Sequence, residues 1–399
     1  MTNLMTNSLF NTDIDRHATS SVKWDRYKNS DVLPLWVADM DFRSPPEVLE
    51  ALHQRIDHGV FGYTSPPDSL NQTVIERLNN LYGWPIESSW LEWLPGLVCA
   101  LNLSVRAFTE EQEFVITPKP VYHPFLSAPT LANRQMMNIF WREGANGHSR
   151  LDSGLDWELD WEWLEQNIRP DARLFLLCNP QNPNGRVLTL KELERLERFC
   201  RQHNLIVCSD EVHCDLILDK QCQHIPYASI SDYARDHSIT LMAPSKTFNL
   251  AGLGCAFAVI PNPALREKFQ RTLTGIVPSP DLMGYTATEA AYRHGEPWRQ
   301  ALLAHLRSNH DYLLARINTI PGLSMRPNEA TYLAWIHCDI PGISQLQPFF
   351  EEYGVGLSPG AQFGAADYVR LNFGCTRKVL EEAINRMEQA VATAHKLAG

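Results

Sequence analysis

The stretch SITLMAPSKTFNLAGLG, residues 238–254, contains the junction of strand and loop from which the fold can be worked out. Its first six residues, SITLMA, are mostly apolar and partly β-branched, which predicts a buried strand. The strand runs directly into Pro244, Ser245 and Lys246. A lysine at the end of a buried strand is costly unless it is paired or used covalently, and lysine amines form imines with carbonyl compounds. Lys246 is therefore either a solvated loop lysine or a reactive amine, and the segments upstream have to decide between the two.

Strands of the same kind recur along the chain and alternate with helical patterns. We expect strands within residues 89–96, 113–119, 135–141, 172–180, 205–213 and 254–260, in addition to residues 238–243. Apolar strands that alternate with helices are typical of an α/β fold, in which a mostly parallel sheet carries helices on both faces. Ligands in such folds bind at the carboxyl ends of the strands.

The helical patterns come with recognisable ends. Residues 44–59 predict a helix with Ser44 as its N-cap and Gly59 as its stop, and Thr189 is a plausible N-cap for a helix that ends near residue 203. We expect further helices over residues 71–84, 97–108, 297–320 and 376–398. Residues 142–160 are polar and rich in Gly and Asp, which predicts a surface excursion, and the polar residues 1–30 are expected to wrap over another surface.

The regular alternation of strands and helices ends at about residue 262, which divides the chain into unequal parts. We expect an N-terminal arm over residues 1–45 that forms part of a small domain, a large domain over residues 46–290, and a C-terminal small α+β domain over residues 291–399.

Composition excludes several classes of function. The chain has 399 residues, 44% of them hydrophobic and 20% charged, and its net charge of −11 argues against binding to nucleic acid. No apolar run is long enough to span a membrane, and the N-terminus lacks the apolar core of a signal peptide. We therefore expect a cytoplasmic protein with no nucleic-acid or membrane partner.

The nine cysteines are scattered, odd in number and without a CxxC pair, which favours reduced thiols over a disulfide framework. His213, Cys214, Cys222 and His224 lie near each other in sequence, but their spacing matches no zinc template. We expect no metal site.

Three strand ends carry polar motifs in order: CNPQNPNG at residues 178–185, SDEVH at residues 209–213, and Ser-Lys at residues 245–246. The first motif alone is a turn, and Asp210 in the second is either a buried, paired carboxylate or part of a site. Pyridoxal phosphate needs this combination: a lysine for the imine, an acid to keep the ring nitrogen protonated, a donor for the ring oxygen, and backbone amides at a helix N-terminus for the phosphate.

In this order the motifs resemble a known family. Together with VADMDF, HGVFGY and YVRLNFGC, they are similar to the class I/II aminotransferase-like, fold type I pyridoxal-phosphate enzymes, and in particular to the MalY/PatB branch of cystathionine β-lyases and cysteine-S-conjugate C–S lyases. The resemblance runs from about residue 12 to the C-terminus. It implies a large domain with a mostly parallel seven-stranded sheet, a smaller α+β domain, and pyridoxal 5′-phosphate as the cofactor.

The resemblance also implies roles for single residues. Lys246 carries the cofactor and shuttles the proton, Asp210 pairs with the ring nitrogen, and Asn182 holds the ring oxygen and touches the substrate carboxylate. Tyr122 stacks on the ring and is counted with Lys246 among the catalytic residues. The amides of Gly96, Leu97 and Val98 bind the phosphate at the start of a helix.

Further implied roles concern the substrate and a second subunit. Arg370 clamps the substrate carboxylate, with a bidentate geometry that lysine could not copy. Tyr63 reaches the phosphate or the substrate of the other subunit as a catalytic residue, which makes the protein a homodimer with shared active sites. Asp39 lies at the substrate edge of the pocket. His213 is either a donor to the ring oxygen or a packed histidine, and both alternatives stay open, while Tyr332 and Trp335 either line the pocket or belong to the core.

One departure from the family pattern stands out. Many aminotransferases bind the phosphate with an arginine eight residues after the lysine, where this chain has Gly254, and the position three before the lysine is Ala243. The phosphate must then rely on Ser245, backbone amides and Tyr63, which weakens the interpretation as a plain transaminase.

The first hypothesis for function is a C–S β-lyase that cleaves cystathionine or a cysteine S-conjugate to a thiol, pyruvate and ammonia. The alternatives are an aminotransferase that shares the same first steps, and a regulatory protein that binds a transcription factor in addition to catalysis. The sequence does not identify the thiol that leaves, because pocket shape decides it.

Overall fold

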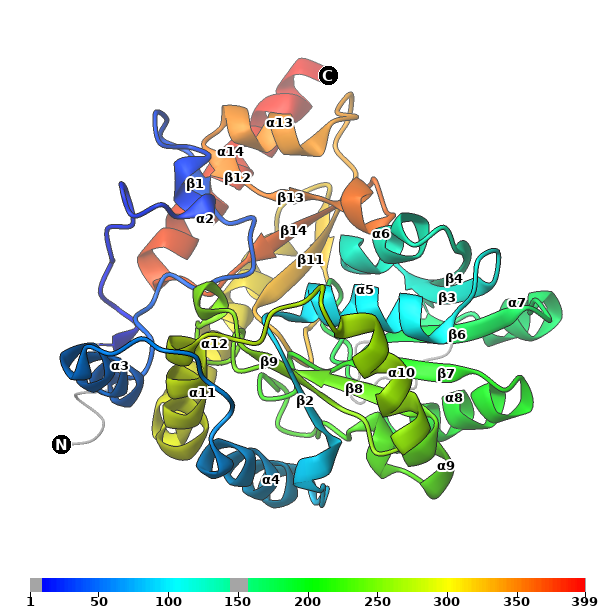
Figure 1. The fold of residues 1–399 in the computed structure, drawn as a ribbon. Helices are drawn as coiled ribbons and strands as arrows, with labels where there is room; N and C mark the ends of the chain where they lie inside the picture. The colour runs from blue at the N-terminus through cyan, green and yellow to red at the C-terminus, as the bar shows by residue number, and fades with distance from the viewer. Residues whose placement is uncertain (1–8, 144–156, 399) are drawn as a thin grey trace.

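The protein is built around a large mixed sheet in a computed structural model that describes residues 9–143 and 157–398 (Figure 1). The expectations for residues 1–8 and 144–156 lie outside the described part. The large sheet has eight strands in the order β2-β9-β8-β7-β6-β3-β4-β5. Their bounds are β2 Leu91–Leu94, β3 Phe114–Lys119, β4 Gln135–Glu143, β5 Trp157–Leu159, β6 Ala172–Cys178, β7 Ile206–Asp210, β8 Ser238–Met242 and β9 Ala256–Val259.

Pairing in the middle of this sheet is parallel, from β4 through β3, β6 and β7 to β8, and the pairs with β9 and β5 are antiparallel. This confirms the predicted α/β fold with a mostly parallel sheet. The expected number of seven strands is wrong for the described residues, because β5 forms an eighth at the edge. It has three residues, too few to show a strand pattern, and hydrogen bonds from the last residues of β4 define it instead.

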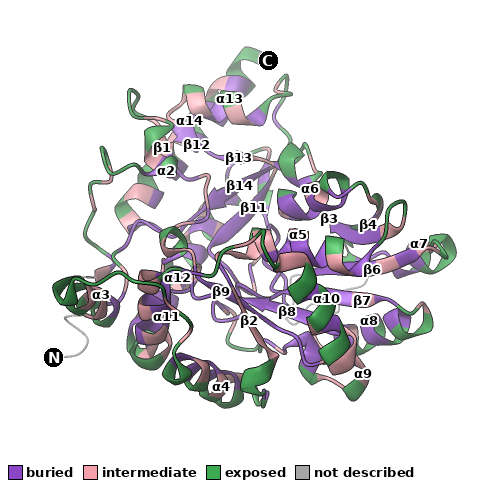
Figure 2. Ribbon diagram, viewed as in Figure 1, coloured by how far each residue is buried: buried purple, intermediate pink, exposed green. Residues whose placement is uncertain are grey.

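Helices cover both faces of the sheet because its strands present apolar residues alternately to each side. In β6, Leu174 and Leu176 pack in the core under one face, while Phe175 and Leu177 pack under the other. The first face carries α5 Leu97–Phe108, α6 His123–Leu131 and α10 Pro263–Leu273. The second carries α4 Asp68–Tyr82, α7 Trp161–Asn167, α8 Leu190–Gln202 and α9 Asp232–Asp236. Figure 2 shows the central strands buried between helices whose outer sides are exposed.

A second, antiparallel sheet of four strands has the order β10-β11-β14-β13. Its strands are β10 Leu323–Met325, β11 Leu333–Cys338, β13 Ser358–Pro359 and β14 Tyr368–Asn372, and a short parallel pair joins β1 Leu33–Pro34 to β12 Val355–Gly356. The helices beside it are α12 Glu296–Ile317, α13 Leu346–Glu352 and α14 Arg377–Ala398. N-terminal residues such as Phe10 and Met40 belong to the same apolar cluster, so the arm packs on this part of the chain. The predicted domain boundaries at residues 45 and 290 stay a prediction.

Helix ends confirm some of the predicted caps and correct one. Thr189 caps α8 in a full capping box with Glu192, and Gly59 ends α3 Pro46–His58 in the left-handed conformation. Ser44 is not an N-cap, because α3 begins at Pro46 and the Ser44 hydroxyl donates instead to the Asn249 carbonyl at 3.2 Å. The remaining helices are α2 Val22–Asp25 and α11 Leu282–His294. Within the described ranges, every helix is too short or too polar to cross a membrane.

Candidate active site

A cavity of about 330 Å³ lies at the carboxyl ends of the parallel strands. Register places it there, since Cys178 at the end of β6 pairs with Asp210 at the end of β7, and Asp210 pairs with Leu241 near the end of β8. The loops that leave these ends are the predicted motifs. Most of the predicted site residues therefore line this one cavity: Gly96, Leu97, Val98, Tyr122, Asn182, Asp210, His213, Ser245, Lys246 and Arg370.

Lys246 enters the cavity from the turn after β8, and its Nζ donates to the carbonyl oxygen of Ala38 at 2.9 Å. Burial lowers the pKa of the Lys246 amine from 10.5 to about 8; the charge of Arg370 acts in the same direction, and Asp39 and Asp210 oppose it. A large fraction of this amine is therefore uncharged near pH 8, the form that can attack a carbonyl or accept a proton.

Asp210 is the last residue of β7, and its Oδ1 accepts a hydrogen bond from the Val212 N–H at 3.1 Å. Burial raises the pKa of Asp210 from 3.8 to about 6, although the Val212 N–H and the charge of Lys246 favour the ionised form. At neutral pH the carboxylate is charged but poorly stabilised, so it would bind a buried cation strongly. A protonated ring nitrogen is such a cation.

Glu211 follows Asp210 but faces the other side of the strand, where its partners are complete. Its carboxylate is fully buried and accepts from Ser209 Oγ at 2.8 Å and the Tyr227 N–H at 2.9 Å, and it lies 2.7 Å from His224 Nε2. The acidic pair in SDEVH thus divides into one carboxylate that faces the cavity and one that belongs to the core.

Arg370 on β14 closes the cavity on the side of the small sheet. Its Nη1 donates to Asn182 Oδ1 at 3.0 Å and its Nη2 to the Trp36 carbonyl at 2.9 Å, and the guanidinium lies 4.7 Å from the centre of the Phe363 ring. Burial lowers the pKa of Arg370 to about 10, so it stays charged at neutral pH. Its Nε is buried without a hydrogen-bond partner among the described residues, which leaves a donor for an anionic ligand.

The N-terminus of α5 supplies the backbone amides that a phosphate needs. Gly96 is the N-cap of this helix, and the amides of the first turn have no partner within the helix. Gly254 lies beside this turn with φ +52°, and a Cβ added there would come within 3.3 Å of the Pro95 carbonyl. A side chain at position 254 would therefore be strained in this backbone, and the phosphate has no arginine here to bind.

His213 lines the cavity, and its Nδ1 is buried without a hydrogen-bond partner among the described residues. Burial lowers its pKa to about 3, and the charges of Lys246 and Arg370 add to this effect, so the imidazole is neutral. Amine, carboxylate, guanidinium, helix amides and an unsatisfied imidazole nitrogen around one cavity fit pyridoxal phosphate, an aldehyde that carries a ring nitrogen, a ring oxygen and a phosphate.

Comparisons with known proteins agree with this geometry. The sequence model described as aminotransferase class I and II matches residues 30–387. The chain belongs to this family. It is 36% identical to cystathionine beta-lyase PatB of Bacillus subtilis over 392 residues, which cover 95% of this chain and 98% of PatB.

Solved structures of similar proteins support the same grouping. The crystal structure of OvoB matches with a TM-score of 0.91 and 46% identity over 96% of this chain and 100% of that one. The structure of cystalysin from Treponema denticola, which contains a pyridoxal 5′-phosphate cofactor, matches with a TM-score of 0.89 and 30% identity over 96% of this chain and 98% of cystalysin.

Two residues expected at the site of this family member lie outside the cavity. Tyr63 is fully exposed and does not line the pocket of its own chain. Asp39 does not line the cavity either, and its Oδ2 lies 2.8 Å from Arg16 Nη2. The contact of Tyr63 with a second subunit stays a prediction. The contact of Asp39 with the substrate also stays a prediction, and the position of Asp39 outside the cavity does not favour it.

The structure of this aminotransferase-family chain also adds residues that the sequence did not reveal. Trp36, Ala38, His123, Gln362 and Phe363 line the cavity. Ala38 belongs to the VADMDF motif and Trp36 directly precedes it, but Ala38 acts through its carbonyl, which no side-chain pattern encodes. Tyr332 donates to the same carbonyl at 3.0 Å, and Trp335 is buried; neither belongs to the residues that line the cavity.

Proposed function

We propose that the chain is a C–S β-lyase that cleaves cystathionine or a cysteine S-conjugate by α,β-elimination. The cofactor is pyridoxal 5′-phosphate, which, when bound, withdraws electrons from the substrate Cα. The observation that carries the proposal is the meeting of Lys246, Asp210 and Arg370 in one cavity at the strand ends. The roles of these residues follow from their charge states.

Lys246 holds the cofactor and then, as a free amine, removes the proton from Cα, since its lowered pKa gives it enough uncharged form near neutral pH. Asp210 supplies the negative charge that keeps the ring nitrogen protonated. Arg370 binds the substrate carboxylate and so turns the Cα–H bond toward Lys246, while Asn182, which accepts from Arg370, fixes the orientation of the guanidinium.

The elimination balances with water as the only co-reactant. The Cα–H electron pair forms the Cα–Cβ double bond, and the Cβ–S bond breaks with its electron pair on sulfur, which leaves as the thiol after taking a proton. The three-carbon product, 2-aminoacrylate, is released and takes up water to give pyruvate and ammonia. An aminotransferase would use the same residues for proton removal but would keep the amino group on the cofactor.

The test is to incubate the purified enzyme with L-cystathionine, L-cystine and S-alkyl cysteines, and to measure pyruvate and thiol with and without a keto acid. A lyase releases the two products in equal amounts without the keto acid. Turnover that needs the keto acid and yields no thiol would contradict the proposal and favour the aminotransferase. A Lys246→Ala enzyme is the control for the spontaneous reaction.

We also propose that two copies share their active sites through Tyr63. Val60, Phe61 and Tyr63 expose large apolar side chains on one short loop, which supports burial of this loop against a second copy. Co-expression of an inactive Tyr63→Phe chain with an inactive Lys246→Ala chain should restore about a quarter of the activity, because half the dimers are mixed and each has one intact site. If mixed dimers form and stay inactive, Tyr63 does not act across the interface.

A further inference from the structure

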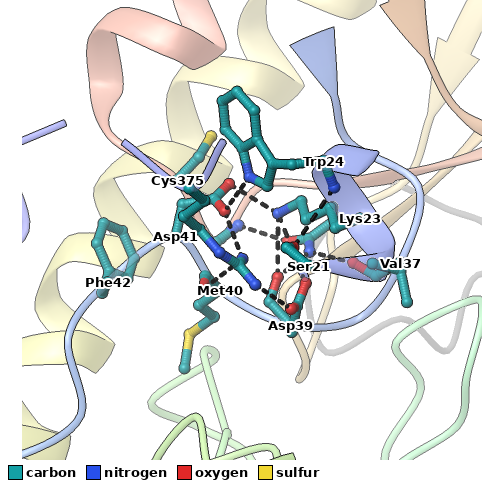
Figure 3. A network of polar contacts seen from close by, with 12 residues as sticks. Ser21, Lys23, Trp24, Val37, Asp39, Met40, Asp41, Phe42 and Cys375 are labelled. Carbon is teal, nitrogen blue, oxygen red and sulfur yellow. Dashed lines mark hydrogen bonds and ion pairs between the residues drawn. The ribbon is translucent and has the colours of Figure 1, made fainter. Parts of the chain in front are cut away.

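Four charged residues near the N-terminus, Arg16, Lys23, Asp39 and Asp41, form a network beside the segment that lines the cavity. Figure 3 shows Lys23 together with Asp39 and Asp41. Lys23 Nζ lies 2.7 Å from Asp41 Oδ2 and 3.9 Å from Asp39 Oδ1. Arg16 lies 2.7 Å from Asp41 and 2.8 Å from Asp39. Two cations therefore neutralise two carboxylates, and Trp24 Nε1 completes the set with a hydrogen bond to Asp41 Oδ1 at 3.0 Å.

Burial of this network is unusual for residues of an N-terminal arm. The side chain of Lys23 is 0% exposed and that of Asp41 10% exposed. Burial acts to raise the pKa of Asp41, but Lys23 and the hydrogen bonds from Lys23, Trp24 and Arg16 outweigh it and lower that pKa. Because a buried ion pair contributes little net stability, compared with an apolar pair of the same size, stability alone does not account for such an arrangement.

The network fixes the segment of residues 36–41, which forms one wall of the cavity. Lys23 Nζ donates to the Asp39 carbonyl at 3.1 Å, and Arg16 Nη1 donates to the Met40 carbonyl at 3.3 Å. Two other carbonyls of the same segment accept hydrogen bonds from side chains that line the cavity. The Ala38 carbonyl accepts from Lys246 at 2.9 Å, and the Trp36 carbonyl accepts from Arg370 at 2.9 Å.

We propose that Lys23 and Asp41, supported by Arg16 and Asp39, are positioning residues that hold the Ala38 carbonyl against the free amine of Lys246. The inference rests on the proposed function, in which this amine alternates between a covalent and a free state. The carbonyl gives the free amine a fixed hydrogen-bond acceptor, so the amine keeps one place in the cavity. The arm thereby becomes part of the catalytic apparatus without touching substrate.

The position of the Ala38 carbonyl should affect the pKa of Lys246. An acceptor at 2.9 Å stabilises the charged ammonium form, so a displaced Ala38 carbonyl would make the amine easier to deprotonate. The other groups around this amine are Asp210 at the end of β7, His213 from the loop that follows, Arg370 from β14, Tyr122, Tyr332 and Asp39. None of these is changed in the experiment that follows.

The experiment compares the cofactor-free wild-type chain with Lys23→Met/Asp41→Leu, which removes one positive and one negative charge together. The probe is acetic anhydride, and mass spectrometry follows acetylation of Lys246 against pH. We expect a wild-type midpoint of about 8 and a midpoint lower by roughly one pH unit in the variant, the size expected for loss of a hydrogen bond to a charged group. In the loaded enzyme, kcat should fall by more than KM rises.

The matched control is Asp13→Asn/Lys378→Met, which breaks another ion pair between the arm and the C-terminal helix, at 3.2 Å, and does not touch residues 36–41. Its midpoint should equal that of the wild type. If Lys23→Met/Asp41→Leu does not fold, as judged by circular dichroism, Lys23→Met/Asp41→Asn takes its place, because methionine removes the donor to the Asp39 carbonyl while the amide can still accept from Trp24 and Arg16.

An unchanged Lys246 midpoint in a folded variant would overturn the inference, because the network would then serve stability alone. An equal shift in the control would overturn it as well. Neither outcome bears on the proposed function, which depends on products formed by the loaded wild-type enzyme. Conversely, if the cofactor attaches to another lysine, the proposed function fails whatever the acetylation shows.

Discussion

Two buried aspartates in this molecule, Asp41 and Asp210, lie in opposite electrostatic surroundings. The Asp41 carboxylate forms ion pairs with Lys23 and Arg16 and accepts a hydrogen bond from Trp24 Nε1, and together these contacts lower its pKa. Asp210 accepts a hydrogen bond from the Val212 N–H, with Lys246 contributing charge from a distance, and its pKa is raised to about 6. One carboxylate is neutralised by the fold, whereas the other leaves a place for a cation from outside the chain.

The same contrast separates the two regions as a whole. In the network of the arm, each cation lies against a carboxylate. In the cavity, Lys246, Arg370 and His213 all have pKa values lowered by burial, and Arg370 Nε and His213 Nδ1 lack partners among the described residues. In the cavity, the groups that the fold leaves without a partner are therefore the ones available to a ligand.

Among substitutions in the cavity, Lys246→Ala should cause the largest loss of turnover. Loss of the amine removes both the attachment of the cofactor and the base, so turnover of cystathionine to pyruvate should fall at least ~10³-fold. Lys268→Ala on α10, an exposed lysine that does not line the cavity, is the control and should leave turnover unchanged. Retention of more than a tenth of the activity by Lys246→Ala would contradict its assigned role.

The two aspartates give the sharpest paired test. Asp210→Asn should lower turnover at least ~100-fold, since the ring nitrogen loses its counter-charge, and the unfolding temperature should not fall. Asp41→Asn should lower the free energy of unfolding by about 3–5 kcal/mol, because Lys23 loses its buried partner. The two changes are measured by pyruvate release and by denaturant unfolding. Equal effects of both variants on stability and turnover would remove the distinction between the two regions.

Two buried arginines extend the comparison. Arg370 retains a free donor, whereas Arg77 lies 2.7 Å from Asp215 in a closed ion pair. Arg370→Ala should cost at least about tenfold in kcat/KM, with KM raised, because a charge-assisted contact to the substrate carboxylate is worth about 1.5–3 kcal/mol. Arg77→Met should act on the unfolding temperature instead. A raised KM in Arg77→Met with normal stability would count against this division.

The smallest expected effect is a pH dependence of stability in the cofactor-free protein. Because the folded pKa of Asp210 is about 6 and its ordinary value is 3.8, folding favours the protonated carboxyl, and stability is lost as the pH rises through this window. The loss amounts to at most about 3 kcal/mol, which corresponds to a few degrees in unfolding temperature. Wild type and Asp210→Asn should therefore converge at pH 4 and separate by pH 7, with the variant the more stable. Parallel curves would show that Asp210 titrates normally.

Sequence patterns predicted those parts of the molecule that local chemistry determines. The helix expected over residues 97–108 is α5, and Thr189 caps α8, because apolar spacing and capping residues act within a few positions. Strand β5 lies in residues 142–160, which were expected to form only a surface excursion, because the strand depends on pairing with β4. The N-cap predicted at Ser44 was also wrong, because its hydroxyl contacts Asn249 instead.

The candidate site divides in the same way. Asp210 ends a strand, and Lys246 and Asn182 lie in loops that leave neighbouring strands, so their motifs predicted that they would meet at one edge of the sheet. The Ala38 carbonyl and Lys23 gave no such signal, because a backbone acceptor has no residue type and Lys23 lies 223 positions from Lys246 along the chain. Contacts of that kind become visible only when the fold brings the segments together.

The lysine that carries the cofactor can be identified by chemical trapping. The loaded enzyme is treated with borohydride, which fixes the cofactor to the amine that carries it, and peptide mapping then identifies the modified residue. We expect a single modified peptide that contains Lys246, and we expect this modification to be lost in Lys246→Ala. Modification of a different lysine in the wild-type enzyme would contradict the claim that this cavity is the active site.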